Sequence, residues 1–147
     1  MKAGATARYC ALLYGHDDLL LKTRGYLLST IDCGSVAAHN LREYKQQVLT
    51  PALNLIVICQ TMSLQECEAA AAFATEARIT AQMLLLYARQ QPCSPDGGSV
   101  IFNAASGPAA FLQTAGRMLI TTGRDIQHVS LADLPAAMHL SAYLSLW

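Results

Sequence analysis

The sequence predicts an α/β protein whose core is a doubly wound, parallel, five-stranded sheet. Residues 55–58, Leu-Ile-Val-Ile, form an unbroken run of branched aliphatic side chains, which is typical of a strand buried on both faces. Ser63-Leu-Gln-Glu66 follows with the pattern of a capping box, in which the Ser63 hydroxyl and the Glu66 carboxylate bind free amides of a new helix. Segments of strand and helix character alternate along the rest of the chain, which indicates parallel strands joined by helices.

The first strand is expected at residues 7–14, which are apolar from residue 10 onward. A polar turn ends it, and either Asp17 or Asp18 can cap the helix that follows to about residue 29. Gly25 lies inside this helix, where a glycine costs about 1 kcal/mol relative to alanine.

The middle of the chain supplies the next two strands and helices. Residues 35–39 predict a short, weak second strand, and Asn40 starts a brief helix that Pro51 terminates. The central strand then leads into the Ser63 helix, which is rich in alanine to residue 77. Its smooth stripe of small side chains would lie close to the sheet.

The last third predicts two strands and one helix. Residues 82–88 contain a second fully apolar run and form the fourth strand, and residues 100–103 form a short fifth strand. Between them, residues 89–99 hold two prolines and two glycines, so they can hardly form a helix. A final helix starts with Pro108 near its first position and ends before Gly123.

Composition narrows the class of protein. The formal net charge is zero and the pI is about 6.9, so no basic field favours nucleic acid as a partner. The chain has five cysteines without a CxxC pair, which argues against both a disulfide framework and a zinc ribbon. The N-terminus lacks the apolar region of a signal peptide, and no apolar run approaches the roughly 20 residues that span a bilayer. We expect a cytoplasmic protein with reduced thiols and no membrane contact.

Four segments give the chain a resemblance to the receiver domains of bacterial response regulators. Residues 11–18 resemble the opening strand and acidic turn of a receiver, and residues 54–59 resemble its phosphoacceptor strand. Residues 85–88 resemble its switch strand, and residues 101–104 its final strand. The resemblance extends over about residues 7–122. It implies a flavodoxin-like sheet of order 2-1-3-4-5, with the topological switch point between the first and third strands.

The positions that carry phosphorylation in receivers hold other residues here. Active receivers use an aspartate acceptor, an acid pair that holds Mg²⁺, a switch serine or threonine, and a lysine. The matching positions are Cys59 for the acceptor, Gly15 and His16 (or His16 and Asp17) for the acid pair, Tyr87 for the switch residue and Asn103 for the lysine. Mg²⁺ prefers several carboxylate or phosphate oxygens. The resemblance therefore implies a degenerate pseudo-receiver without catalysis, metal or cofactor.

Function then follows from the fold and its surface. We expect a non-catalytic signalling or regulatory module of the two-component type, which acts by protein–protein interaction. Receivers keep a fourth helix between their fourth and fifth strands, and here that helix is expected to be shortened or missing. The alternative is a small redox-responsive or ligand-binding protein that uses Cys59 and His16 at the switch point, since a neighbouring imidazolium lowers a thiol pKa. A plain packing role for Cys59 competes with it.

Residues 123–147 form a C-terminal extension beyond the receiver-like domain at residues 1–122. Asp133 can cap a helix there. An apolar stripe follows at i, i+3, i+4 and i+7: Leu140, Tyr143, Leu144 and Trp147. The stripe can fold back on its own domain or dock on a second copy. The apolar content of 53% against 14% charged residues favours the second copy, and we expect a homodimer.

Overall fold

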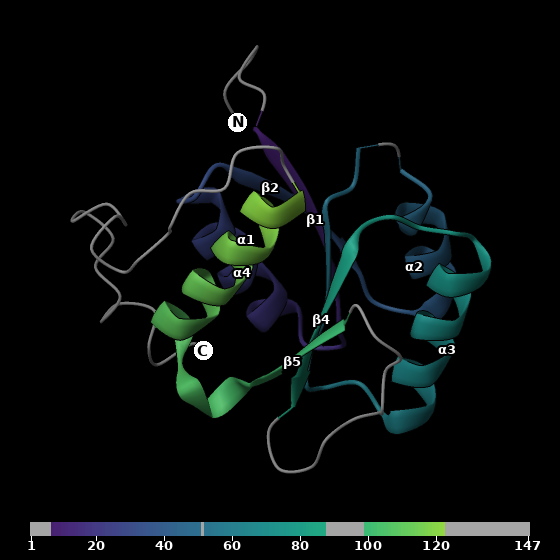
Figure 1. Cartoon of the computed structure of the whole chain (residues 1–147). Coiled ribbons are helices and arrows are strands. Elements are labelled where there is room, and N and C mark those ends of the chain that lie inside the picture. Colours follow the sequence, from purple (N-terminus) through teal and green to yellow (C-terminus); the bar gives the residue numbers. More distant parts are fainter. Residues whose placement is uncertain (1–6, 51, 88–98, 123–147) are drawn as a thin grey trace.

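A computed structural model describes residues 7–50, 52–87 and 99–122 of the chain. It contains one parallel five-stranded sheet in the order β2-β1-β3-β4-β5, and helices connect the first four strands along the chain (Figure 1). The strands are β1 (Tyr9–Tyr14), β2 (Cys33–Ala38), β3 (Leu55–Ile58), β4 (Gln82–Tyr87) and β5 (Ser99–Asn103). The helices are α1 (Asp18–Ser29), α2 (Leu41–Val48), α3 (Leu64–Glu76), the 3₁₀ turn η1 (Ala104–Ser106) and α4 (Pro108–Thr122). The predicted fold class and strand order are confirmed.

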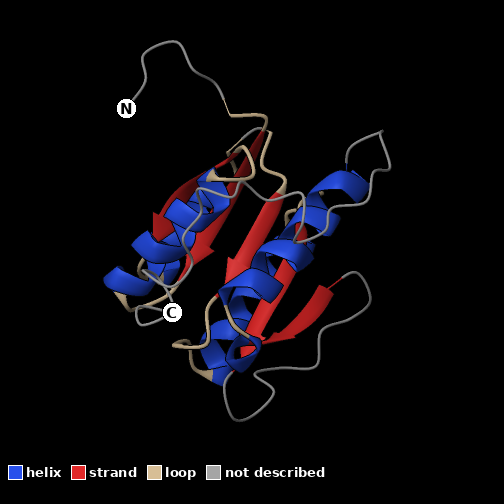
Figure 2. Ribbon diagram, turned by 90° about the vertical axis from the view of Figure 1, so that its left-hand side faces the viewer, coloured by secondary structure: helices blue, strands red, loops and turns tan. Residues whose placement is uncertain are grey.

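The central strand β3 is buried on both faces, as its sequence predicts. Leu55 and Val57 point into the layer formed with α1 and α4, whereas Ile56 and Ile58 point into the layer formed with α2 and α3. Figure 2 shows the helices on the two faces of the sheet. Because neither face of β3 reaches water, every side chain of this strand is apolar, on both faces.

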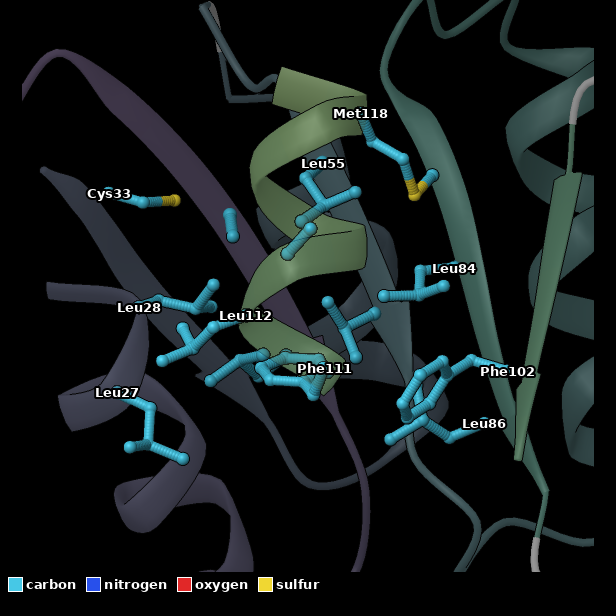
Figure 3. Packing of buried hydrophobic residues seen from close by; sticks show 14 of the residues in the cluster. Leu27, Leu28, Cys33, Leu55, Leu84, Leu86, Phe102, Phe111, Leu112 and Met118 are labelled. Carbon is cyan, nitrogen blue, oxygen red and sulfur yellow. The ribbon is translucent and has the colours of Figure 1, made fainter. Parts of the chain in front are cut away.

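The layer on the α1 and α4 side is a continuous apolar core (Figure 3). Phe111 and Leu112 of α4 belong to the same buried cluster as Leu27 of α1, and Phe111 contacts Phe102 of β5 edge to face at a centroid distance of 6.3 Å. Burying a side chain of this size contributes about 1.5–3 kcal/mol. This packing fixes α1, and therefore the loop that precedes it, against the sheet.

Three polar side chains start the helices beside the carboxyl ends of β1, β2 and β3. Asp17 accepts hydrogen bonds from the amides of Leu19 and Leu20, so Asp17, rather than Asp18, caps α1. Asn40 caps α2. Ser63 and Glu66 form both bonds of the capping box at α3. Each cap satisfies amides that have no partner inside the helix, and together they fix where three loops end.

Long-range pairing extends two strands beyond the sequence expectation. β2 starts at Cys33 rather than at residue 35, because Cys33 and Gly34 pair with Tyr9 and Cys10 of β1. β5 likewise starts at Ser99, which pairs with Met83. Gly25 of α1 lies against β2: an ideal Cβ there would come 2.7 Å from the Ser35 hydroxyl oxygen. The glycine therefore allows α1 to approach β2 closely.

Several sequence expectations lie outside the described residues. They are the shortened or missing fourth helix, since residues 88–98 of the connection between β4 and β5 are not described, the extension at residues 123–147 with its stripe, and the boundary between the extension and the domain. Within the described ranges, no helix has the length and apolar character that a membrane span requires.

Candidate functional site

The candidate site lies at the carboxyl ends of β1 and β3, where the sheet order places the topological switch point. Tyr14 and Ile58 form the last register pair of these strands. The Cys59 amide extends the pairing by donating to the Tyr14 carbonyl at 2.9 Å. On the other side of β1, the Gly15 amide donates to the Ala38 carbonyl at 3.1 Å. These bonds hold Gly15 and Cys59 side by side at the carboxyl ends of the strands, which we call the carboxyl edge of the sheet.

Gly15 lies so close to its neighbours that a side chain there would press against them. An ideal Cβ on Gly15 would lie 3.0 Å from Cys59 Cβ, 3.1 Å from Thr61 Oγ1 and 3.3 Å from Leu21 Cδ2. Contacts of this length are tighter than ordinary van der Waals packing. Adding even one methyl group therefore requires the loop after β3 to move.

Cys59 is a buried thiol with only 2% of its surface exposed. Burial raises the pKa of the thiol, because the thiolate would lose its solvation. The guanidinium of Arg24, a fully buried side chain of α1, acts in the opposite direction, and the Asp17 carboxylate raises the pKa further. Burial dominates, so Cys59 is a protonated thiol at neutral pH.

His16 connects the loop after β1 to α3. Its amide donates to Thr61 Oγ1 at 3.0 Å, and its ring Nε2 lies 2.8 Å from Glu66 Oε2. The other Glu66 oxygen accepts from the Ser63 amide at 2.9 Å. The Ser63 bond and the His16 contact lower the pKa of Glu66. Within the described part of the chain, no hydrogen bond joins His16 to the Cys59 thiol, so the geometry does not favour the thiol–imidazole pair.

The remaining receiver-like positions lie along the same edge of the sheet. Asp17 is engaged as the cap of α1. Tyr87 and Asn103 end β4 and β5 and are register partners. Asn103 Oδ1 accepts from the Ala105 amide at 2.9 Å and so caps η1. The fold brings Gly15 against Cys59, whereas Tyr87 and Asn103 lie on the far side of β3.

A stacked pair of tyrosines, one at the end of β1 and one in α2, was not expected from the sequence. Tyr14 is fully buried and its ring stacks on Tyr44 with centroids 4.7 Å apart. The Tyr44 hydroxyl donates to the Ala70 carbonyl at 2.8 Å, but the Tyr14 hydroxyl has no hydrogen bond within the described residues. Burial, with a smaller effect of Glu66, raises the pKa of Tyr14 to about 12. Only the place of Tyr14 at the end of an apolar strand hints at this burial.

Comparisons with known proteins identify the fold. No protein-family model matches the chain, and no curated protein matches it. Solved structures do match. A signal receiver domain from Vibrio parahaemolyticus is 11% identical with a TM-score of 0.66, over 78% of this chain and 92% of that one. The receiver domain of Francisella response regulator 1452 is 13% identical with a TM-score of 0.65, over 78% and 99%. A sensor protein from Polaromonas sp. JS666 is 12% identical with a TM-score of 0.64, over 79% and 99%.

This chain has a receiver-like fold. At these identities the likeness concerns the fold, and the chemistry of the receiver-like domain is decided by its own side chains. Its edge does not fit Mg²⁺, which prefers oxygen ligands in octahedral geometry. Gly15 has no side chain, Asp17 accepts two amides, the His16 ring bonds to Glu66, and the Cys59 thiol is buried. Across residues 7–50, 52–87 and 99–122, no three His, Cys, Asp or Glu side chains are placed to hold a metal ion.

Proposed function

We propose that this receiver-like domain is a non-catalytic signalling or regulatory module that acts through protein contacts and has lost phosphorylation. One observation carries the proposal: Gly15 and Cys59 are packed against each other, with 3.0 Å between an ideal Gly15 Cβ and Cys59 Cβ. The place of an acidic side chain is therefore filled by the neighbouring loop. A buried, protonated thiol occupies the position that the resemblance assigns to the phosphoacceptor.

The chemistry at this edge supports the same proposal. An acceptor must present a nucleophilic oxygen or sulfur to solvent, and a thiol is nucleophilic only as a thiolate. Cys59 has neither exposure nor a lowered pKa. His16, which also lies at this end of the sheet, is held by Glu66. We therefore assign the function of this domain to contacts that its surface makes with another protein.

Phosphorylation from a small donor tests the proposal. The full-length protein is incubated with acetyl phosphate and Mg²⁺ and then measured by intact-mass spectrometry, next to an active receiver domain as a positive control. We expect a phosphoryl adduct on the control and none on this protein. A stable adduct on an aspartate of this chain would contradict the loss of phosphorylation.

We further propose that the C-terminal extension makes the domain a homodimer. The support is the apolar stripe of four large side chains on residues 140–147, together with the high apolar content of the chain. Large aromatic side chains with few charges around them suit the centre of an interface. Deleting residues 131–147 should then convert a dimer into a monomer in sedimentation velocity.

Matched point variants sharpen this experiment. Leu144→Asp places a charge on the stripe and should dissociate the dimer, because a carboxylate buried without a partner is strongly unfavourable. Ser145→Asp adds the same charge one position away, off the stripe, and should leave the dimer intact. A full-length chain that is already monomeric at tens of micromolar would refute the homodimer.

A further inference from the structure

His39 lies between two carboxylates that come from different helices. It follows β2, and its ring Nε2 lies 3.1 Å from Asp18 Oδ1 at the start of α1. Its ring Nδ1 lies 3.1 Å from Glu43 Oε1 in the first turn of α2. The His39 amide donates to the same Glu43 oxygen at 2.8 Å. The imidazole therefore bridges the amino-terminal ends of α1 and α2.

Only one protonation state of the imidazole satisfies both contacts. A neutral imidazole carries a proton on one ring nitrogen, and its other nitrogen is an acceptor. That acceptor would then face a carboxylate, which is also an acceptor, at 3.1 Å. The imidazolium has N–H groups on both nitrogens and can donate to Asp18 and Glu43 together.

The charges around His39 favour the same state. Lys22 of α1 lies 3.1 Å from the second Asp18 oxygen, so the cluster holds two carboxylates and one ammonium besides the imidazole. The cluster is neutral when His39 is protonated, and it carries one negative charge when His39 is not. The His39 side chain keeps 42% of its surface exposed, so it exchanges protons with solvent directly.

We propose that His39 is a pH-sensitive clamp that joins α1 to α2 at the carboxyl edge of the sheet. The clamp is closed while the imidazole is protonated, because both carboxylates are then bound. When His39 loses its proton, one of the two contacts becomes repulsive and the junction between the helices loosens. The receiver-like domain thus responds to pH at the carboxyl edge of its sheet. At this edge other residues replace those that carry phosphorylation in active receivers.

The pH range follows from the direction of the shifts. Hydrogen bonds to Asp18 and Glu43 raise the pKa of His39 above its ordinary value. The clamp therefore contributes fully below the unfolded-state pKa of histidine, about 6.5. Its contribution is lost as pH rises through the higher folded-state pKa. The bonds to His39 also lower the pKa of Asp18 and of Glu43, so the clamp weakens again in acid as these carboxylates take up protons.

An NMR titration of the full chain tests the clamp. The His39 ring resonance, assigned by its loss in His39→Gln, should titrate above the ordinary histidine value. Backbone amides at the start of α1 and at Glu43 should change with the same midpoint. In Asp18→Asn and in Glu43→Gln the midpoint should shift to lower pH. Asp32→Asn removes the same charge from an exposed residue at the amino-terminal end of β2, whereas His39 follows the carboxyl end of that strand. This variant should shift the midpoint less.

Three results would overturn the proposal. A His39 midpoint at or below the ordinary value would show that the carboxylates do not hold the proton. Amides of α1 that ignore the His39 titration would show that the helices are not coupled through the ring. Equal shifts in Asp18→Asn and Asp32→Asn would show a general charge effect in place of a specific contact.

Discussion

Replacing Gly15 by alanine tests the close approach at the centre of the proposed function. The backbone of Gly15 does not lie in the left-handed region, so alanine can adopt it and the effect comes from the added methyl group. That methyl would lie 3.0 Å from Cys59 Cβ and 3.1 Å from Thr61 Oγ1. Neither atom yields easily, because the Cys59 amide is bonded to Tyr14 and Thr61 Oγ1 is bonded to the His16 amide.

The expected loss of stability is the difference between two terms. Overpacking a rigid site costs about 1–3 kcal/mol. Replacing glycine by alanine at a compatible backbone position returns about 0.4–1 kcal/mol through the unfolded chain. We expect Gly15→Ala to lower the free energy of unfolding by about 1–2 kcal/mol. For a domain of this size, the unfolding temperature would fall by roughly 2–8 °C.

Urea unfolding followed by far-UV circular dichroism measures this loss, with an unchanged m-value as the sign of intact two-state folding. Gly34→Ala is the matched control, because a Cβ there has one close contact, 3.3 Å to Ala7 Cβ, where Gly15 has three, and it lies an ordinary 3.8 Å from the Tyr9 carbonyl. The control should lose less stability than Gly15→Ala. If Gly15→Ala unfolds at the same urea concentration as the control, the loop has room for a side chain and the argument for a filled site fails.

Two further predictions concern the residues around this site. Tyr14→Phe removes a buried hydroxyl without a described partner, so stability should stay unchanged or rise by up to about 1 kcal/mol. Tyr44→Phe removes the bond to the Ala70 carbonyl and should lose about 1 kcal/mol in the same urea assay. The reverse order of stability would contradict the assignment of the two hydroxyls. Cys59→Ala should lose about 1 kcal/mol as a small cavity forms, and Cys59→Asp should lose more because it buries a carboxylate. A Cys59→Asp variant as stable as wild type that binds Mg²⁺ would show that the site is less degenerate than proposed.

The sequence alone determined the class of fold and the ends of most helices. The buried run at residues 55–58 is readable because a strand covered on both faces excludes polar side chains. The caps at Asn40 and Ser63 are readable because each depends on residues at most three positions away. Even the choice of Cys59 as the residue after the central strand needed only the length of that run. These features arise from contacts within one turn or one strand.

The tertiary structure decided which side chains meet at the edge of the sheet. His16 and Cys59 end neighbouring strands, but the His16 ring bonds to Glu66, which lies 50 residues away in sequence. His39 reaches Asp18 across 21 residues. The direction of such side chains depends on the path of each loop and on the packing of the helix that follows it. Neither is encoded by a local pattern.

Arg24, which is buried beside Cys59, is the clearest case of a side chain whose place only the tertiary structure decides. A charged residue in an amphipathic helix is expected on the solvent side, yet Arg24 has no exposed surface. Its position follows from the close approach of α1 to the sheet, which Gly25 permits at β2. Whether Cys59 is a reactive thiol or a packing residue is decided by that layer of neighbours. Burial and nearby charge set a thiol pKa, and both are properties of the assembled fold.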